Sequence, residues 1–122
     1  MSKGLHVLVV DDEWSLRDLA KDILEGVGYQ VTKAANPQEA RAQLAKMGYS
    51  ILITDNNMPS GTGIDLLRDI PEQYPDMARL LVSAERDALT AAAEMDIPGL
   101  EKPYRPFQLI AAVEQALSAL TR

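Results

Sequence analysis

Short apolar segments alternate along this chain with longer segments in which apolar residues recur every three or four positions. Residues 5–10 and 51–54 are rich in Val, Leu and Ile, a composition typical of strands that are buried on both faces of a parallel sheet. Shorter segments of the same kind follow at intervals. The pattern predicts strands at residues 5–10, 29–35, 51–54, 78–83 and 100–101.

The longer segments predict amphipathic helices between the strands. The first has apolar residues at helical spacing from Leu16 to Val27 and is ended by Gly26 or Gly28. The second starts at Asn36 and Pro37, a capping residue followed by a proline suited to the first helical position, and runs to about residue 47.

Three further helices are predicted in the second half of the chain. One has its apolar face at residues 64–70, and Pro71 is expected to end it early. Another covers residues 86–95. The last opens at Pro106, and its predicted inward stripe consists of Phe107, Ile110, Val113, Leu117 and Leu120.

Strand and helix therefore alternate five times without an internal repeat or a linker, which predicts a single α/β domain over residues 1–122. Right-handed crossovers place helices on both faces of such a sheet. Ligands of open parallel sheets bind beyond the carboxyl ends of the strands, so the residues that follow each strand are the candidates for function.

Polar residues stand at those positions. Asp11 and Asp12 follow the first strand, Asp55 the third, Ser83 the fourth and Lys102 the fifth. Each has a simple structural explanation when taken alone: a helix cap for Asp12 and Ser83, a turn for Asp55 and a solvated charge for Lys102.

Their convergence on one edge favours chemistry instead. Three carboxylates at one edge repel one another unless protons or a cation relieve them. Mg²⁺ binds oxygen ligands and typically uses one or two protein carboxylates together with phosphate oxygens. Asp11, Asp12 and Asp55 fit that requirement, and Lys102 and Ser83 could hold the other oxygens of a phosphoryl group.

Composition narrows the function classes. The net charge of −6 and the pI near 4.7 argue against a nucleic-acid surface. The chain has no Cys, which excludes thiol catalysis and suits a reducing cytoplasm. The first apolar run stops at Asp11, far short of the roughly 20 residues of a membrane span, so no membrane association is expected.

Four segments in order resemble the receiver domains of response regulators in two-component signalling, the CheY-like superfamily. They are LHVLVVDDE, ILITDNNMPSGTG, LLVSAE and EKPYRP. The resemblance covers nearly the whole chain. It implies a flavodoxin-like, doubly wound (βα)5 domain with a five-stranded parallel sheet of order 2-1-3-4-5 and helices on both faces.

The resemblance also implies roles for the site residues. Asp12 would bind Mg²⁺ directly, Asp11 largely through water and Asn57 through its backbone carbonyl. Asp55 would be a metal ligand and also the nucleophile that takes a phosphoryl group from a phosphohistidine.

Lys102 and Ser83 would contact the transferred phosphoryl group, which water would later remove slowly. The implied partners are a histidine kinase or histidine phosphotransfer protein and a downstream effector or output domain. Such a domain is a switch with slow autophosphatase activity rather than a turnover enzyme. Phosphorylation-dependent homodimerisation stays open.

The chain departs from the family around its fourth helix. Gly99 stands where relatives usually carry an aromatic residue, and the segment from Ser83 to Lys102 is a few residues short. These departures leave an alternative, a pseudo-receiver that binds partners without being phosphorylated. An aspartate-nucleophile phosphatase would need a second Asp two residues after the nucleophile, where Asn57 stands, and a flavodoxin-like cofactor binder would need aromatic, hydroxyl-rich loops.

Overall fold

The computed structural model describes residues 4–120 and contains a five-stranded parallel sheet of strand order β2-β1-β3-β6-β7. This order is the predicted 2-1-3-4-5 arrangement once a small separate hairpin is left out of the numbering. The sheet strands are β1 (His6–Val10), β2 (Gln30–Ala34), β3 (Ile51–Asp55), β6 (Ala78–Ser83) and β7 (Gly99–Glu101).

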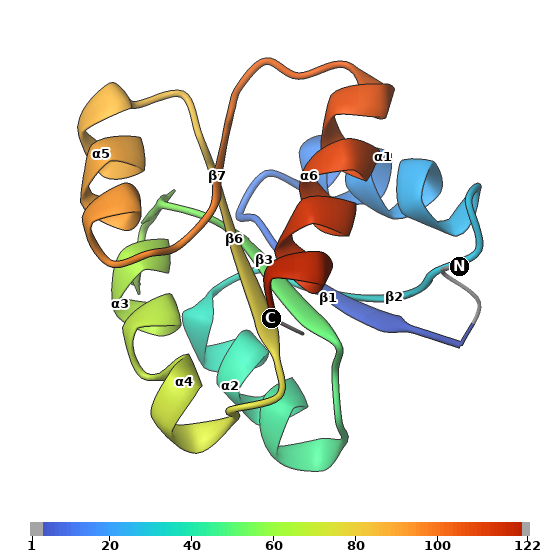
Figure 1. Ribbon diagram of the computed structural model, residues 1–122, viewed down its shortest axis with the longest axis horizontal. Helices are drawn as coiled ribbons and strands as arrows, with labels where there is room; N and C mark the ends of the chain where they lie inside the picture. Colours follow the sequence, from blue (N-terminus) through green and yellow to red (C-terminus); the bar gives the residue numbers. More distant parts are fainter. Residues whose placement is uncertain (1–3, 121–122) are drawn as a thin grey trace.

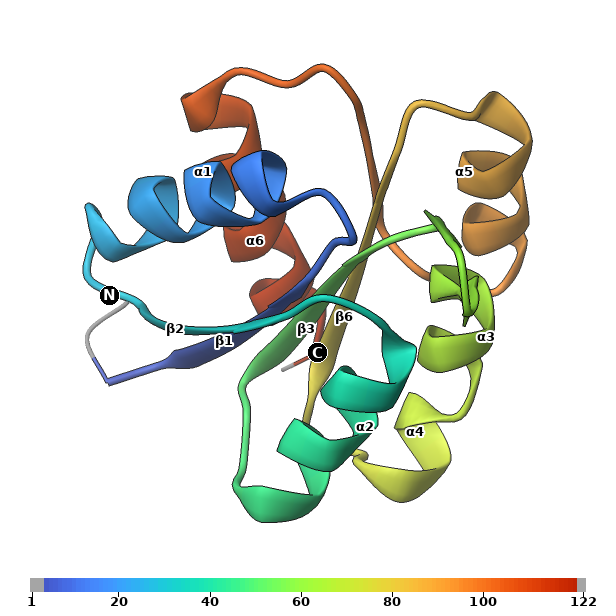
Figure 2. The ribbon, with the colours of Figure 1, turned by 180° about the vertical axis from the view of Figure 1, so that it is seen from behind.

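Helices cover both faces of the sheet, as predicted (Figures 1 and 2). Helices α1 and α6 pack on one face, and the other four helices pack on the opposite face. The bounds are α1 (Trp14–Glu25), α2 (Pro37–Lys46), α3 (Gly63–Arg68), α4 (Ile70–Gln73), α5 (Arg86–Glu94) and α6 (Pro106–Leu120).

Alternate residues of the central strands supply two separate cores. In β1, Leu8 and Val10 point into the core beneath α2, α3 and α5, whereas Val7 and Val9 point into the core beneath α1 and α6. All four side chains are buried. Burial on both faces explains why the strand sequence is continuously apolar rather than alternating.

The start of α2 follows the predicted capping pattern. The side chain of Asn36 accepts a hydrogen bond from the Glu39 amide at 2.8 Å, and Pro37 occupies the first turn. The Glu39 carboxylate accepts in return from the amide of Ala35 at 2.8 Å. These contacts satisfy amides that a helix start leaves without intrahelical partners.

Two predictions needed refinement in the segment after β3. The turn-rich stretch forms a small antiparallel hairpin from β4 (Asn57–Met58) and β5 (Gly61–Thr62). The third helix ends at Arg68, and a short α4 follows with Pro71 in its first turn, where a missing amide hydrogen costs no helical bond.

The predicted inward stripe of the last helix was partly wrong. Val113 is fully buried, but Phe107 is 66% exposed and Leu120 is 39% exposed, and the buried stripe instead includes Leu109 and Ala116. The helix is apolar nearly all round, so periodicity alone does not identify the face that meets the sheet.

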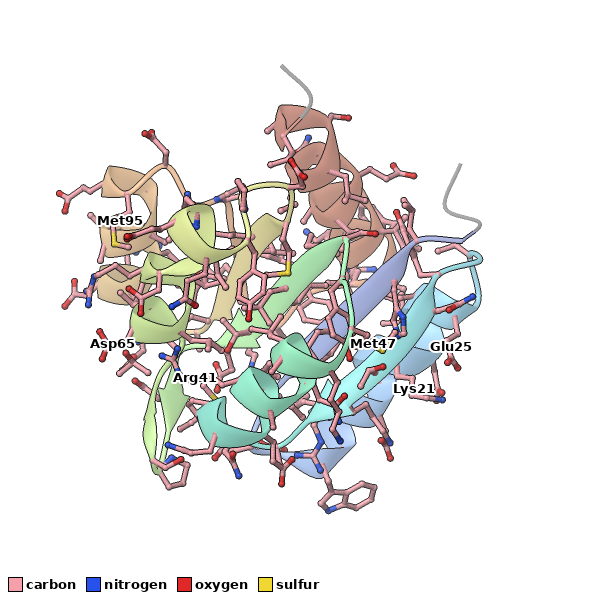
Figure 3. The ribbon with its side chains drawn as sticks, turned by 90° about the horizontal axis from the view of Figure 1, so that it is seen from below. Lys21, Glu25, Arg41, Met47, Asp65 and Met95 are labelled. Carbon is pink, nitrogen blue, oxygen red and sulfur yellow. The ribbon has the colours of Figure 1, made fainter. Side chains whose placement is uncertain are left out.

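Helix α1 shows a similar difference. Ala20 and Leu24 are buried, whereas Leu19 is 47% exposed, and Val27 lies beyond the end of the helix and is 41% exposed. The outer surface of the helix has an ion pair between Lys21 and Glu25 at 2.9 Å (Figure 3). Within residues 4–120, no helix has the length and apolarity that a membrane crossing requires.

Candidate functional site

The carboxyl ends of the sheet strands bring the predicted acidic residues together. Asp11 and Asp12 follow β1, and Asp55 is the last residue of β3. One carboxylate oxygen from each of the three lies within 4.8 Å of the others. Two adjacent residues after β1 and one at the end of β3 therefore form one acidic cluster at the carboxyl edge of the sheet, whose strands are labelled in Figure 1.

Lys102 closes this cluster from the loop after β7. Its Nζ lies 3.0 Å from Oδ2 of Asp11 and 3.2 Å from Oδ1 of Asp55. The three side chains are only 10–17% exposed. A single ammonium group thus bridges two largely buried carboxylates, a geometry in which charge interactions are much less screened than at the surface.

The surroundings shift the ionisation of both partners. Burial raises the pKa of the Asp55 carboxyl, and the neighbouring Asp11 charge adds to this effect, although Lys102 opposes it. Burial by itself would lower the pKa of Lys102, but its contacts with Asp11 and Asp55 outweigh burial and raise it. The cluster therefore holds a lysine that stays cationic and a carboxylate whose negative charge is disfavoured without a further cation.

Asp11 is fixed by contacts on each of its oxygens. Its Oδ1 accepts a hydrogen bond from the amide of Glu13 at 3.0 Å, while its backbone carbonyl accepts from Nη1 of Arg17 at 2.6 Å. Asp12, in contrast, is exposed and makes no hydrogen bond or ion pair with any residue between 4 and 120. It does not cap α1, because the capping position is Glu13, whose side chain makes no capping bond.

The side chain and the carbonyl of Asn56 organise the loop after β3. Asn56 is buried, its Oδ1 accepts from the amide of Ile64 at 3.1 Å, and its carbonyl accepts from the amide of Gly63 at 2.9 Å. These bonds tie the loop to the start of α3, so the polar side chain has a structural role at this position.

Gly63 approaches the Asp55 backbone very closely. A Cβ added at Gly63 would lie 2.2 Å from the carbonyl oxygen of Asp55 and 2.9 Å from Cγ2 of Thr54. No side chain fits without moving backbone. The neighbouring Thr62 caps α3 by accepting from the Asp65 amide at 3.1 Å.

Ser83 and Asn57 flank the acidic cluster. Ser83 is buried, and its hydroxyl oxygen accepts a hydrogen bond from the amide of Glu85 at 3.0 Å. The side-chain amide of Asn57 donates to the Glu85 carboxylate across the gap between the two loops. The predicted site residues Asp11, Asp12, Asp55, Asn57, Ser83 and Lys102 thus all belong to one edge of the sheet.

Sequence reasoning missed two groups that shape this edge, Arg17 and Gly63. An arginine early in a helix and a glycine in a turn are common features, and neither has a spacing that indicates contact with the acidic loops. Trp14, next to the acidic pair, is 68% exposed. His6 packs inside the fold: its Nε2 lies 2.8 Å from Oγ1 of Thr32, and its ring meets Tyr49 edge-on.

An apolar groove of about 320 Å³ lies beside the acidic cluster. Its lining comes from the start of α1, the loop after β6 and the loop after β7. The lining residues are Leu16, Leu19, Ala84, Lys102, Pro103 and Tyr104.

Comparisons with known proteins agree with this arrangement. Residues 7–114 match the response regulator receiver domain family. The chain is 32% identical to the hydrogenase transcriptional regulatory protein HoxA of Cupriavidus necator and to the DNA-binding transcriptional regulator NtrC of Salmonella typhimurium, covering 96% and 97% of this chain. It spans only about a quarter of each of those two proteins, 25% and 26%.

A shorter relative and two solved structures match over most of their length. The chemotaxis protein CheY-3 of Vibrio cholerae is 31% identical over 85% of each chain. The structure of CheY4 of Vibrio cholerae has a TM-score of 0.83 and 29% identity, covering 92% of this chain and 98% of that one.

TrrA of Thermotoga maritima, solved in complex with Mg²⁺ and BeF, has a TM-score of 0.84 and 26% identity over the same shares, 92% and 98%. The family match over residues 7–114, the strand order and the acidic cluster at the carboxyl edge of the sheet all lead to one assignment. The chain belongs to the family of response regulator receiver domains.

Proposed function

We propose that this chain is a phosphoacceptor switch that receives a phosphoryl group on Asp55 in a Mg²⁺-dependent reaction. One observation carries the proposal: three carboxylates from two strands meet within 4.8 Å of one another, and a largely buried lysine bridges two of them. Such a cluster destabilises the fold, because like charges at close range disfavour ionisation. A cation that binds among the carboxylates removes this repulsion.

The donor set fits a magnesium ion. Its oxygens are hard ligands, and the exposed Asp12 carboxylate has no competing partner among the described residues. Asp12 and Asp55 would bind the ion directly, Asp11 largely through water and Asn57 through its backbone carbonyl. When bound, the ion supplies positive charge that lets the carboxylates coexist and offsets the charge of phosphate oxygens.

In the proposed reaction a carboxylate oxygen of Asp55 attacks the phosphorus of a phosphohistidine on the partner. A P–O bond forms as the P–N bond breaks, and the imidazole leaves with the electron pair and takes up a proton. Lys102, already 3.2 Å from Asp55, offsets negative charge on the phosphoryl oxygens. Ser83 uses its oxygen as an acceptor toward Glu85, so its hydroxyl proton is available for donation to a phosphoryl oxygen.

The switch would operate through the loop after β6. Phosphorylation adds about −1.5 to −2 charges and three acceptor oxygens next to Ser83. Drawing Ser83 toward the phosphoryl group would move Glu85 as well, because the Glu85 amide donates to the Ser83 hydroxyl. To move the loop from almost entirely one conformation to almost entirely the other, the phosphoryl group must interact with the second conformation about 5.5 kcal/mol more favourably than with the first.

Reversal would be hydrolytic and slow. Water would attack the acyl phosphate by a path flanked by Asn57 and Glu85, whose side chains are hydrogen-bonded to each other, and the small Ala84 leaves room for its approach. This activity resets a switch and does not turn over an external substrate, so we infer that the chain is not an enzyme in the ordinary sense.

The proposed phosphodonor is a cytoplasmic histidine kinase or histidine phosphotransfer protein. The apolar groove that Lys102 and Tyr104 help to line is suited to an apolar surface of such a partner because it opens beside the acidic cluster. HoxA and NtrC are transcriptional regulators roughly four times longer than the matched segment, which supports an output domain or separate effector downstream.

The test is direct phosphorylation by a small donor. The protein is incubated with acetyl phosphate and Mg²⁺, and its intact mass is measured for the wild type, Asp55→Asn and the matched surface variant Asp76→Asn. We expect an adduct of one phosphoryl group in the wild type and in Asp76→Asn, none in Asp55→Asn, and none when EDTA replaces Mg²⁺.

The same measurement distinguishes a phosphoacceptor from the alternative, a pseudo-receiver that is not phosphorylated. A pseudo-receiver, favoured by Gly99 and the short α5, would show no adduct in any variant at saturating Mg²⁺ and acetyl phosphate. An adduct that persists in Asp55→Asn would place the phosphoryl group elsewhere and overturn the assignment of Asp55.

A further inference from the structure

The turn that presents the acidic pair lacks the usual support of a helix start. The capping position of α1 is Glu13, whose side chain makes no hydrogen bond to the helix amides, and the first turn of α1 contains no acidic residue. The Glu13 amide donates to Oδ1 of Asp11 at 3.0 Å, but no capping side chain reinforces this link. A side-chain contact from elsewhere in α1 therefore strengthens the position of the Asp11–Asp12 turn.

Arg17 supplies one of these contacts. From the first turns of α1 it reaches back so that Nη1 donates to the backbone carbonyl of Asp11 at 2.6 Å, in partly buried surroundings. Asp11 lies beyond the last residue of β1; its amide donates to the carbonyl of Ala34 at 3.2 Å, but no backbone amide among residues 4–120 donates to its carbonyl. A partly buried backbone carbonyl needs a hydrogen-bond donor, and a hydrogen bond from a charged donor is stronger than one from a neutral donor.

One other side-chain contact of Asp11 involves the reactive edge itself. Its Oδ2 binds Lys102, a group that must serve phosphoryl oxygens in the function proposed above. Arg17 differs because it binds the backbone and neither of the acidic carboxylates, so its contact does not need to change when metal or phosphoryl arrives. It can hold the turn in both states of the switch.

We propose that Arg17 is a positioning residue of the metal site: it fixes the Asp11–Asp12 turn through the Asp11 carbonyl and thereby raises the affinity of this chain for Mg²⁺. The inference rests on the proposed function, since it assumes that the acidic cluster binds this ion. It concerns a residue that touches neither metal nor phosphoryl group.

The sign of the effect makes the proposal testable. A cation near a metal site repels Mg²⁺, so Arg17 acting as a charge alone would weaken binding, and its removal would strengthen binding. Arg17 acting as a positioning residue has the opposite effect, because its removal loosens the turn that carries two of the carboxylates. The direction of the change in Mg²⁺ affinity therefore separates the two roles.

The experiment is a Mg²⁺ titration followed by backbone amide NMR shifts, which report folding and affinity together. The variants are Arg17→Met, Arg17→Lys and, as a matched control, Arg41→Met; Arg41 lies on α2 (Figure 3), and its side chain makes no hydrogen bond or ion pair with any residue from 4 to 120. We expect Arg17→Met to weaken Mg²⁺ binding by roughly 3- to 10-fold, comparable with the loss of one charge-assisted hydrogen bond, and Arg41→Met to have no effect.

Arg17→Lys keeps the charge but loses the planar donor, and we expect it to weaken binding as well. Equal or tighter Mg²⁺ binding by folded Arg17→Met would overturn the proposal. If Arg17→Met does not fold, Arg17→Lys decides: wild-type affinity in that variant would contradict a positioning role. Absence of Mg²⁺ binding by the wild type would instead contradict the proposed function itself.

Discussion

The acidic edge and the region around Gly99 are built on opposite principles. At the acidic edge, which comprises Asp11, Asp12, Asp55 and Lys102, the lysine bridges Asp11 and Asp55 at 3.0 and 3.2 Å. Around Gly99, apolar packing and not charge determines the arrangement.

The packing at Gly99 comes from the neighbouring helix. A Cβ added at Gly99 would lie 2.8 Å from Cδ2 of Leu89, so the leucine of α5 occupies the room beside the glycine of β7. We call this pair the Gly99–Leu89 contact. Phosphoryl chemistry depends on particular atoms at particular places, whereas an apolar contact can be made by either partner.

The largest expected effect is at the bridging lysine. Lys102→Met removes the ammonium that faces Asp11 and Asp55, so the phosphoryl oxygens lose their nearest cationic partner. We expect the initial rate of adduct formation with acetyl phosphate and Mg²⁺, read by intact mass, to fall about 100-fold or more.

Lys46→Met is the control for this change, because Lys46 is exposed at the end of α2. It should react at the wild-type rate. If Lys102→Met is phosphorylated within a few-fold of the wild-type rate, the reaction at the acidic edge does not depend on this cation. The proposed difference between the acidic edge and the region around Gly99 would then be wrong.

Gly63→Ala should have the next largest effect, on stability. The added Cβ would meet the Asp55 carbonyl at 2.2 Å, and backbone atoms cannot turn aside as a side-chain end can. We expect the free energy of unfolding, measured by urea denaturation, to fall by about 2–3 kcal/mol.

The matched substitution is Gly48→Ala, where a Cβ would meet nothing within 4 Å. Its free energy of unfolding should stay within about 0.5 kcal/mol of the wild type. Equal effects at the two glycines would mean that the loop after β3 is not held as closely against Asp55 as the distances indicate.

At the Gly99–Leu89 contact we expect a smaller loss of stability, which a second substitution at Leu89 should cancel. Gly99→Ala should lower the free energy of unfolding by about 1 kcal/mol, because the end of the Leu89 side chain can move aside. In a Leu89→Ala background the same substitution should cost nothing. A double-mutant cycle by urea denaturation gives the coupling, and purely additive costs would show that the two residues do not share this space.

The smallest effect is a pH dependence confined to the acidic edge. The pKa of Asp55 is raised in the fold above its ordinary value of 3.8, so the stabilisation present below that pH is lost as pH rises through the raised pKa. Asp55→Asn removes this pH-dependent loss of stability, because asparagine does not ionise. In EDTA the melting temperature of Asp55→Asn minus that of the wild type should therefore increase from pH 3.8 toward neutrality.

Gly99→Ala provides the comparison for that measurement, because it changes no ionisable group. The melting temperature of Gly99→Ala minus that of the wild type should be the same at every pH between 4 and 7. A flat profile for Asp55→Asn as well would indicate that burial does not disfavour the Asp55 charge.

Much of the fold followed from local patterns. The strand segments were apolar because both faces of each central strand are covered, and the start of α2 was readable because Asn36, Pro37 and Glu39 act on adjacent backbone groups. The site residues Asp11, Asp55, Ser83 and Lys102 were identifiable because each lies at the end of a strand or directly after it, and parallel strands share one carboxyl edge.

Other features required the tertiary structure, because they depend on residues that are distant in sequence. The carbonyl contact of Arg17, the close approach of Gly63 to Asp55 and the space shared by Gly99 and Leu89 have no periodicity. Which face of α6 is buried was likewise decided by packing, since Phe107 is as apolar as Leu109. Sequence by itself determined which chemical groups stand at the ends of strands; the packing of helices on the sheet determined their distances, because distance arises only when separate elements meet.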